Sequence, residues 1–155
     1  MIFVTLGTQA YPFDRLLRAL EGVGEELVVQ GGPSEFRPGG ATWFDYLEYE
    51  PLLEHIRRAR VVVSHAGVGT VMTAVAEGKR PVVVPRLHRH GEAVDDHQVP
   101  IARRLAQAGL VTLVEDPEQL AAALVETPPA PASLAGEGGI VADLRAYLLE
   151  VAEAT

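Results

Sequence analysis

Short runs of consecutive apolar residues alternate along the chain with segments in which apolar residues recur every three or four positions. The runs predict buried strands at 2–6, 26–30, 42–46, 61–63, 81–84 and 111–114. The periodic segments predict amphipathic helices that begin near Phe13, Pro51, Thr70, Pro100 and Pro117. Short apolar strands that alternate with helices indicate an α/β fold, a Rossmann-like parallel sheet with helices on both faces.

The stretch 61–71 combines a strand, a glycine turn and the start of a helix. Gly67 and Gly69 allow the backbone to turn sharply, and Thr70 is a suitable first residue for the helix. This order leaves unpaired N–H groups and the positive end of the helix dipole facing one spot, which phosphate commonly occupies. A plain turn between strand and helix explains the same glycines. Met72 stands where a dinucleotide-binding fingerprint has its third glycine, which disfavours an oxidoreductase.

Ligands of parallel sheets bind outside the carboxyl ends of the strands, so the turns after Leu6, Ser64 and Val84 are expected to converge on one crevice. The third of these turns opens the charged segment 85–96, which has no periodicity and predicts a long loop. Its basic residues are Arg86, His88, Arg89 and His90. They form either a solvated loop or an anion site, and in the second case Arg86 contacts a donor phosphate or a sugar carboxylate.

The composition excludes several classes of function. The chain has 155 residues, 48% of them hydrophobic and 22% charged, which fits one globular domain. A formal charge of −8 disfavours nucleic-acid binding, and the lack of cysteine removes disulfides and thiolate chemistry. The sequence contains neither an apolar run of membrane-spanning length nor a signal-peptide pattern. We therefore expect a cytoplasmic location, with any membrane role supplied by a partner.

Potential metal ligands cluster in and after the same loop. They are His88, His90, Glu92, Asp95, Asp96 and His97. Imidazole and carboxylate groups bind zinc, but this spacing fits no established site. We expect no metal and no cofactor.

Proline and glycine divide the chain into a main domain and a short tail. The domain is predicted at 1–126, a linker at 127–139 and an amphipathic C-terminal helix at 140–155. This last helix either folds back on its own domain or docks on another polypeptide.

Several motifs occur together in a fixed order. They are Ser64-His65-Ala66-Gly67-Val68-Gly69-Thr70, Gly78, the run 81–85, Asp96-His97-Gln98 and Ala102-x-x-Leu105. This set resembles the C-terminal donor-binding domain of family 28 glycosyltransferases. The opening motifs, residues 4–8 and 13–16, resemble the small catalytic subunit of two-subunit N-acetylglucosaminyltransferases that act on lipid-linked sugars. Pro85-Arg86, Gly91-Glu92 and residues 96–98 are similar to exopolysaccharide transferase subunits.

The resemblance implies the C-terminal half of a GT-B fold, which binds a UDP-sugar. Single-chain relatives carry the acceptor on an N-terminal domain. Because the first strand begins at Ile2, that domain is expected on a separate, membrane-associated acceptor-binding subunit, with a lipid-linked glycan or polysaccharide as acceptor.

The resemblance also implies roles for individual residues. Those expected to bind the donor diphosphate are Gly7, Thr8, Gly67, Gly69 and Thr70. His65, beside the glycine loop, either contacts the same diphosphate or braces the loop by hydrogen bonding. Backbone near Tyr49 would meet the uracil, and Thr73 stands where relatives that use N-acetylglucosamine often have a ribose-binding glutamate. His97 and Gln98 would reach hydroxyls of the donor sugar. No catalytic base is identified in this chain, and we expect it on the partner.

Two other functions remain open at this point. One is a non-catalytic subunit that binds or senses nucleotide sugars, and the other is the disfavoured dinucleotide oxidoreductase. Sugar transfer by the chain with its partner distinguishes the first from an enzyme, and NADH binding without UDP binding would favour the second.

Overall fold

The computed structural model describes residues 1–125. The expected linker at 127–139 and helix at 140–155 lie outside these residues. None of the helices within residues 1–125 is long and apolar enough to cross a bilayer.

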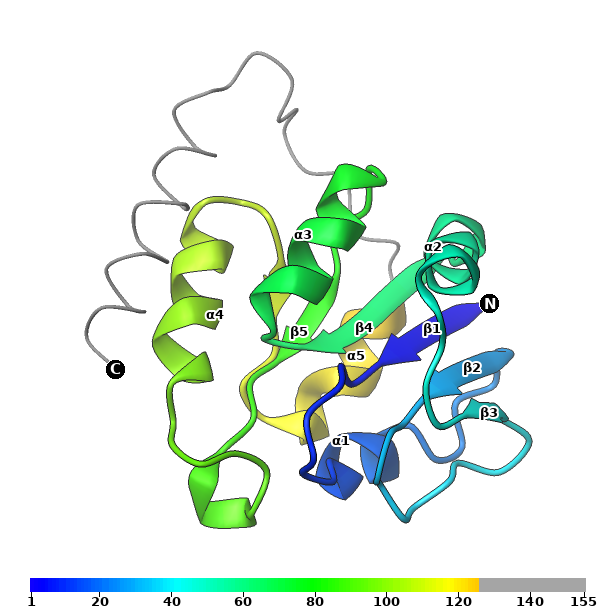
Figure 1. The fold of residues 1–155 in the computed structure, drawn as a ribbon, viewed down its shortest axis with the longest axis horizontal. Helices are drawn as coiled ribbons and strands as arrows, with labels where there is room; N and C mark the ends of the chain where they lie inside the picture. The colour runs from blue at the N-terminus through cyan, green and yellow to red at the C-terminus, as the bar shows by residue number, and fades with distance from the viewer. Residues whose placement is uncertain (126–155) are drawn as a thin grey trace.

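A six-stranded, fully parallel sheet forms the centre of the domain (Figure 1). Its strands are β1 (Ile2–Thr5), β2 (Leu27–Gln30), β3 (Thr42–Phe44), β4 (Val61–His65), β5 (Val82–Val84) and β6 (Thr112–Leu113). Their spatial order is β3-β2-β1-β4-β5-β6. The chain adds β2 and β3 on one side of β1, and then returns to the other side of β1 and adds β4, β5 and β6. This is the strand order of a Rossmann fold.

Helices cover both faces of the sheet, and the Rossmann-like architecture predicted from the sequence is confirmed. The helices are α1 (Asp14–Ala19), α2 (Tyr49–Arg58), α3 (Val68–Ala76), α4 (Gln98–Gln107) and α5 (Leu120–Val125), with 3₁₀ turns η1 (His88–His90) and η2 (Pro117–Gln119). On one face, α1 and α5 pack against alternate strand residues such as Val4 and Val63. On the other, α2, α3 and α4 cover the intervening residues, among them Phe3 and Val83.

Within residues 1–125 the predicted strands and helices are present, with small shifts at their ends. Helix α3 begins at Val68, two residues before the predicted Thr70, because Gly67 serves as its N-cap. Helix α2 begins before Pro51, which lies in its first turn, where a missing N–H costs nothing. Pro100 lies in the first turn of α4, as predicted.

Candidate functional site

The strand order reverses between β1 and β4, and the two glycine turns follow these strands. Thr5 of β1 is in register with Ser64 of β4, so both strands end at the same edge of the sheet. Gly7, just after β1, has φ +74°, in the left-handed region that favours glycine. A crevice at the carboxyl ends of strands where the order reverses is the usual ligand site of such sheets. We call this region, formed by the turns at Gly7 and Gly67, the switch-point crevice.

The imidazole of His65 lies between the two glycines of the crevice. A Cβ at Gly7 would lie 2.4 Å from His65 Nε2, and a Cβ at Gly67 would lie 2.2 Å from His65 Cε1. No side chain fits at either position without displacing the ring. The lack of a side chain at Gly7 and at Gly67 leaves room for the His65 ring between the turns that follow β1 and β4.

Helix α3 starts at this crevice without a capping side chain. The N–H groups of its first turn have no partner within the helix, and they add to the positive end of the helix dipole. Gly69 is exposed, and a Cβ there would meet no atom within 4 Å. Thr70 is half-buried in the same turn. The start of α3 therefore has the free N–H groups and the dipole that favour an anion.

His65 is 4% exposed and belongs to a buried polar network. Its Nδ1 lies 3.2 Å from the side-chain nitrogen of Gln98, whereas its Nε2 is buried without a hydrogen-bond partner. Burial, together with the nearby charge of Arg86, lowers the pKa of His65 to about 3. The ring is consequently neutral at physiological pH.

Arg86 points into the domain, in contrast to the donor contact expected from the sequence. Its guanidinium donates to the carbonyl oxygens of Leu6 (2.7 Å), Tyr11 (2.9 Å) and Glu92 (3.0 Å), and it lies 5.0 Å from the centre of the Phe13 ring. The side chain is 1% exposed, and burial lowers its pKa to about 10, so it remains charged. Arg86 holds the backbone of the β1–α1 connection, and this geometry does not agree with a direct contact to a ligand.

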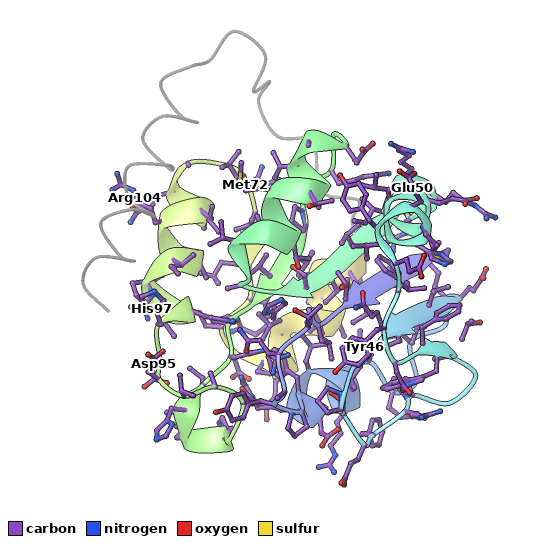
Figure 2. The ribbon with its side chains drawn as sticks, viewed as in Figure 1. Tyr46, Glu50, Met72, Asp95, His97 and Arg104 are labelled. Carbon is purple, nitrogen blue, oxygen red and sulfur yellow. The ribbon has the colours of Figure 1, made fainter. Side chains whose placement is uncertain are left out.

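Gln98 also differs from its expected role. It is 7% exposed, and its side-chain oxygen accepts from the backbone N–H groups of Ala66 (3.2 Å) and Arg86 (3.0 Å). Its amide is thus used inside the protein rather than for sugar hydroxyls. His97 is half-buried at the N-cap of α4, next to the loop that carries Asp95 (Figure 2). Its expected contact with the donor sugar stays a prediction.

The other expected contacts lie on connections around the same fold. Thr8 is exposed just after Gly7. Tyr49 lies in the first turn of α2, on the connection from β3 to β4, and its side chain is 62% exposed. The Thr73 hydroxyl donates to the Gly69 carbonyl at 2.8 Å, within α3. The roles of these three residues toward a nucleotide stay predictions.

The loop between β5 and α4 is organised by an ion pair that the sequence pattern did not reveal. Glu92 is 2% exposed; its carboxylate accepts from Arg15 Nε and an Arg15 terminal nitrogen, both at 2.9 Å, and from the Leu87 N–H at 2.9 Å. The carboxylates of Asp95 and Asp96 accept from backbone amides of the same loop. Within residues 1–125, no three metal-ligating side chains lie close enough to hold an ion. These loop carboxylates shape the backbone.

A cavity of about 880 Å³ is lined by residues of α1 and η2 and by the loop residues Arg89 and His90. Charged side chains of both signs line it, including Arg15, Arg18, Glu115 and Asp116. We call it the α1 groove. Its lining residues do not include the glycines of the switch-point crevice.

Comparison with known proteins places this chain in a family. The family described as the glycosyltransferase family 28 C-terminal domain matches residues 1–137. The UDP-N-acetylglucosamine transferase subunit ALG13 of Mus musculus is 32% identical over 122 residues, covering 69% of this chain and 10% of that protein. ALG13 of Yarrowia lipolytica is 41% identical over 64 residues, covering 41% of this chain and 30% of that protein.

A bacterial relative shares a shorter region. The UDP-N-acetylglucosamine--N-acetylmuramyl-(pentapeptide) pyrophosphoryl-undecaprenol N-acetylglucosamine transferase of Rhodospirillum centenum is 34% identical over 89 residues, covering 54% of this chain and 22% of that protein. The chain thus spans less than a third of the length of each of these curated relatives.

Solved glycosyltransferases share the fold. CalG4, the calicheamicin glycosyltransferase, superposes with a TM-score of 0.57 at 18% identity, covering 97% of this chain and 38% of that one. The glycosyltransferase of kitacinnamycin gives a TM-score of 0.58 at 21% identity, covering 94% of this chain and 40% of that one. The chain therefore corresponds to part of a GT-B glycosyltransferase fold, as predicted.

Proposed function

The chain belongs to the glycosyltransferase family 28 C-terminal domain family, and on that premise we propose that it is the donor-binding catalytic subunit of a UDP-sugar-dependent hexosyltransferase. The observation that carries the proposal is the switch-point crevice. It joins the uncapped start of α3, the glycine turns at Gly7 and Gly67 and the buried His65 at the carboxyl ends of β1 and β4. Backbone N–H groups converging in this way suit a diphosphate.

The proposed catalytic contribution is stabilisation of the leaving group. When the sugar leaves UDP, negative charge develops on the diphosphate, and donors fixed in advance around it lower the barrier without reorganising. Gly7 and Thr8 would approach the diphosphate from β1, and Gly67, Gly69 and Thr70 from the start of α3. Orientation of the bound sugar against the acceptor supplies the rest.

We assign acceptor binding to a separate, membrane-associated subunit and propose a lipid-linked glycan or a polysaccharide as the acceptor. This assignment is supported by the names of the relatives from Mus musculus and Yarrowia lipolytica, both of which are transferase subunits. The catalytic base would then come from the partner, and the chain would act on the cytoplasmic side of the membrane.

Calorimetric titration of the full chain with UDP, UMP and uridine tests the diphosphate site. We expect UDP to bind at least tenfold more tightly than uridine, because hydrogen bonds to charged oxygens contribute about 1.5–3 kcal/mol each. Equal affinities for UDP and uridine would place the diphosphate outside the crevice. A panel of UDP-sugars then identifies the donor, since Thr73 in place of a glutamate leaves sugars other than N-acetylglucosamine open.

Transfer of a labelled sugar separates an enzyme from a sensor of nucleotide sugars. The chain is assayed alone and with the protein encoded beside it, in the presence of a lipid-linked acceptor. Transfer that requires both chains supports the proposal. UDP-sugar binding without transfer in either case would favour a regulatory subunit, and NADH binding without UDP binding would favour an oxidoreductase.

A further inference from the structure

His65 carries a buried ring nitrogen whose hydrogen-bonding capacity is not used within residues 1–125. Its Nε2 is buried, has no hydrogen-bond partner and lies between Gly7 and Gly67. Leaving a buried polar group unpaired costs about 1–3 kcal/mol. Such a group in a native protein calls for a physical explanation. A protonated Nε2 would need an acceptor and an unprotonated Nε2 a donor, so the protonation state shows which kind of partner is missing.

The orientation of the Gln98 amide follows from its neighbours. One end of the amide faces the backbone N–H groups of Ala66, at 3.2 Å, and of Arg86, at 3.0 Å. Two N–H donors require an acceptor, so this end is the oxygen. The other end, which lies 3.2 Å from His65 Nδ1, is therefore the NH₂ group. The backbone thus fixes the amide without reference to the histidine.

The amide in turn fixes the proton of the imidazole. Because the Gln98 NH₂ group donates to Nδ1, that nitrogen is the acceptor, and the single proton of the neutral ring is on Nε2. The ring stays neutral because burial and the charge of Arg86 lower its pKa to about 3. Its N–H group then lies between the two glycines, without an acceptor of its own.

We infer that Gln98 is a positioning residue that holds His65 in the Nε2–H tautomer, so that the neutral ring donates a hydrogen bond to an anionic oxygen bound in the switch-point crevice. This gives Gln98 a role different from the sugar contact expected from the sequence. The identity of the anion, a nucleoside diphosphate, rests on the proposed function. The tautomer does not rest on it and is tested in the free protein.

Nitrogen NMR of the histidine rings tests the tautomer directly. Long-range ¹H–¹⁵N spectra of the full chain without ligand separate protonated from unprotonated ring nitrogens. We expect His65 to be protonated on Nε2 alone from pH 6 to pH 8. Protonation on Nδ1 alone, or on both nitrogens, would overturn the assignment.

Substitution of Gln98 separates positioning from simple packing. In Gln98→Glu, a carboxylate oxygen still accepts from Ala66 and Arg86, but the second oxygen faces Nδ1 and has no proton to donate. The proton of the neutral ring is then expected on Nδ1, and the pKa of the ring is expected to rise. Gln98→Met removes the donor without adding charge and should populate both tautomers. Unchanged His65 spectra in both variants, with melting temperatures near that of the wild type, would overturn the role of Gln98.

A pH series of UDP titrations tests the donated hydrogen bond. The charged group that faces His65 is Arg86, while Gly7, Gly67 and Gln98, from the other elements against the ring, do not titrate. In Gln98→Glu, the neutral ring carries its proton on Nδ1 and has none on Nε2 to donate. We expect the UDP affinity of this variant to be about tenfold lower than that of the wild type at pH 8.5, and the difference to shrink at lower pH as the ring takes up a second proton.

Gln107→Glu is the matched control, because it makes the same chemical change at an exposed position of the same helix. It should follow the wild type at every pH. A Gln98→Glu variant that also follows the wild type would overturn the contact between His65 and the anion. Failure of wild-type UDP binding would overturn that contact together with the proposed function, whereas the NMR result decides the tautomer in either case.

Discussion

The switch-point crevice and the α1 groove both contain polar groups, but the crevice is formed mainly by backbone and the groove by charged side chains. Backbone turns, a helix start and one neutral imidazole form the crevice. The groove, at about 880 Å³, is lined by side chains of both charges, and one of its cations, Arg15, is already paired with Glu92 through two nitrogens at 2.9 Å. Because Arg15 is already paired, it has little charge to offer a phosphate. We therefore expect the groove to be the poorer anion site.

The two regions also differ in what holds them in place. Apart from the largely buried Arg15–Glu92 pair, charged groove residues such as Arg18 and Glu115 are exposed, and exposed ion pairs contribute about 0–1 kcal/mol and weaken in salt. The crevice depends instead on buried residues: His65, Arg86 and Gln98 are each less than 10% exposed and contact one another or the same backbone. Substitutions in the crevice should therefore act on folding and binding together, and substitutions of the exposed groove residues on neither.

Replacing Arg86 should have the largest effect on stability. Arg86→Met removes the donor to the carbonyls of Leu6, Tyr11 and Glu92. Each buried acceptor left unpaired costs about 1–3 kcal/mol, so we expect the free energy of unfolding to fall by about 3 kcal/mol or more. Urea denaturation measures the change. Arg89→Met, three residues along the same loop and exposed, should change stability by less than about 0.5 kcal/mol, and equal effects of the two would refute the distinction.

Adding a methyl group to Gly67 should have the next largest effect. The Cβ of Gly67→Ala would lie 2.2 Å from the His65 ring, which must move. Overpacking of this kind costs about 1–3 kcal/mol, and we expect UDP affinity to fall at least tenfold because the ring and the turn shift together. Thermal melting and calorimetric titration measure the two effects.

Gly69→Ala is the control for this substitution. Its Cβ meets no atom within 4 Å, and the residue lies inside α3. Alanine in place of a helical glycine should raise stability by up to about 1 kcal/mol. A loss of UDP affinity in this variant, without loss of stability, would show that a ligand occupies the space at the start of α3. Destabilisation by Gly69→Ala as large as that by Gly67→Ala would contradict the packing account.

The strands and glycine turns that form the crevice were predictable from the sequence, whereas the buried side chains that hold them in place were not. Valine runs such as 61–63 and the glycines that follow them report strands and turns locally, through β-propensity and backbone freedom. Even so, α3 begins two residues earlier than predicted, because Gly67 caps it directly after a short turn.

The direction of Arg86 and Gln98 depends on residues far away in the chain. The Leu6 carbonyl that Arg86 reaches is 80 positions earlier, and His65 precedes Gln98 by 33. The loop 85–96 has no periodicity that assigns its side chains to the inside or the outside. A basic loop beside an expected phosphate site therefore suggested a ligand contact for Arg86. In the structure, the Arg86 guanidinium instead donates hydrogen bonds to the carbonyl oxygens of Leu6 and Tyr11, in the β1–α1 connection, and to that of Glu92.

The buried His65 should make stability depend on pH in a predictable direction. Its folded-state pKa of about 3 lies below its unfolded value of about 6.5. Below pH 6.5 the unfolded chain therefore binds a proton that the folded chain does not, and stability falls as the pH falls toward 3. The loss reaches about 2 kcal/mol at pH 5.

His65→Gln should remove this contribution to the slope of unfolding free energy against pH. The control is His88→Gln, at an exposed position, which should leave the slope unchanged. Denaturant titrations between pH 7 and pH 5 measure all three slopes. Parallel curves for the wild type and His65→Gln would mean that the ring is protonated in the folded state, contrary to its burial between two glycines.

The smallest effect is expected in the α1 groove, from the double substitution of Arg18 and Arg89 by alanine. Both arginines line the groove and are exposed. UDP affinity should change by less than about twofold, because exposed charges act on a distant ligand through water and are screened within about 10 Å at 0.1 M salt. Titration at 0.05 M and 0.3 M salt separates such a field effect, which salt removes, from a contact. A loss of tenfold or more that persists at high salt would place the phosphate in the groove and leave the glycine turns as ordinary connections between strand and helix.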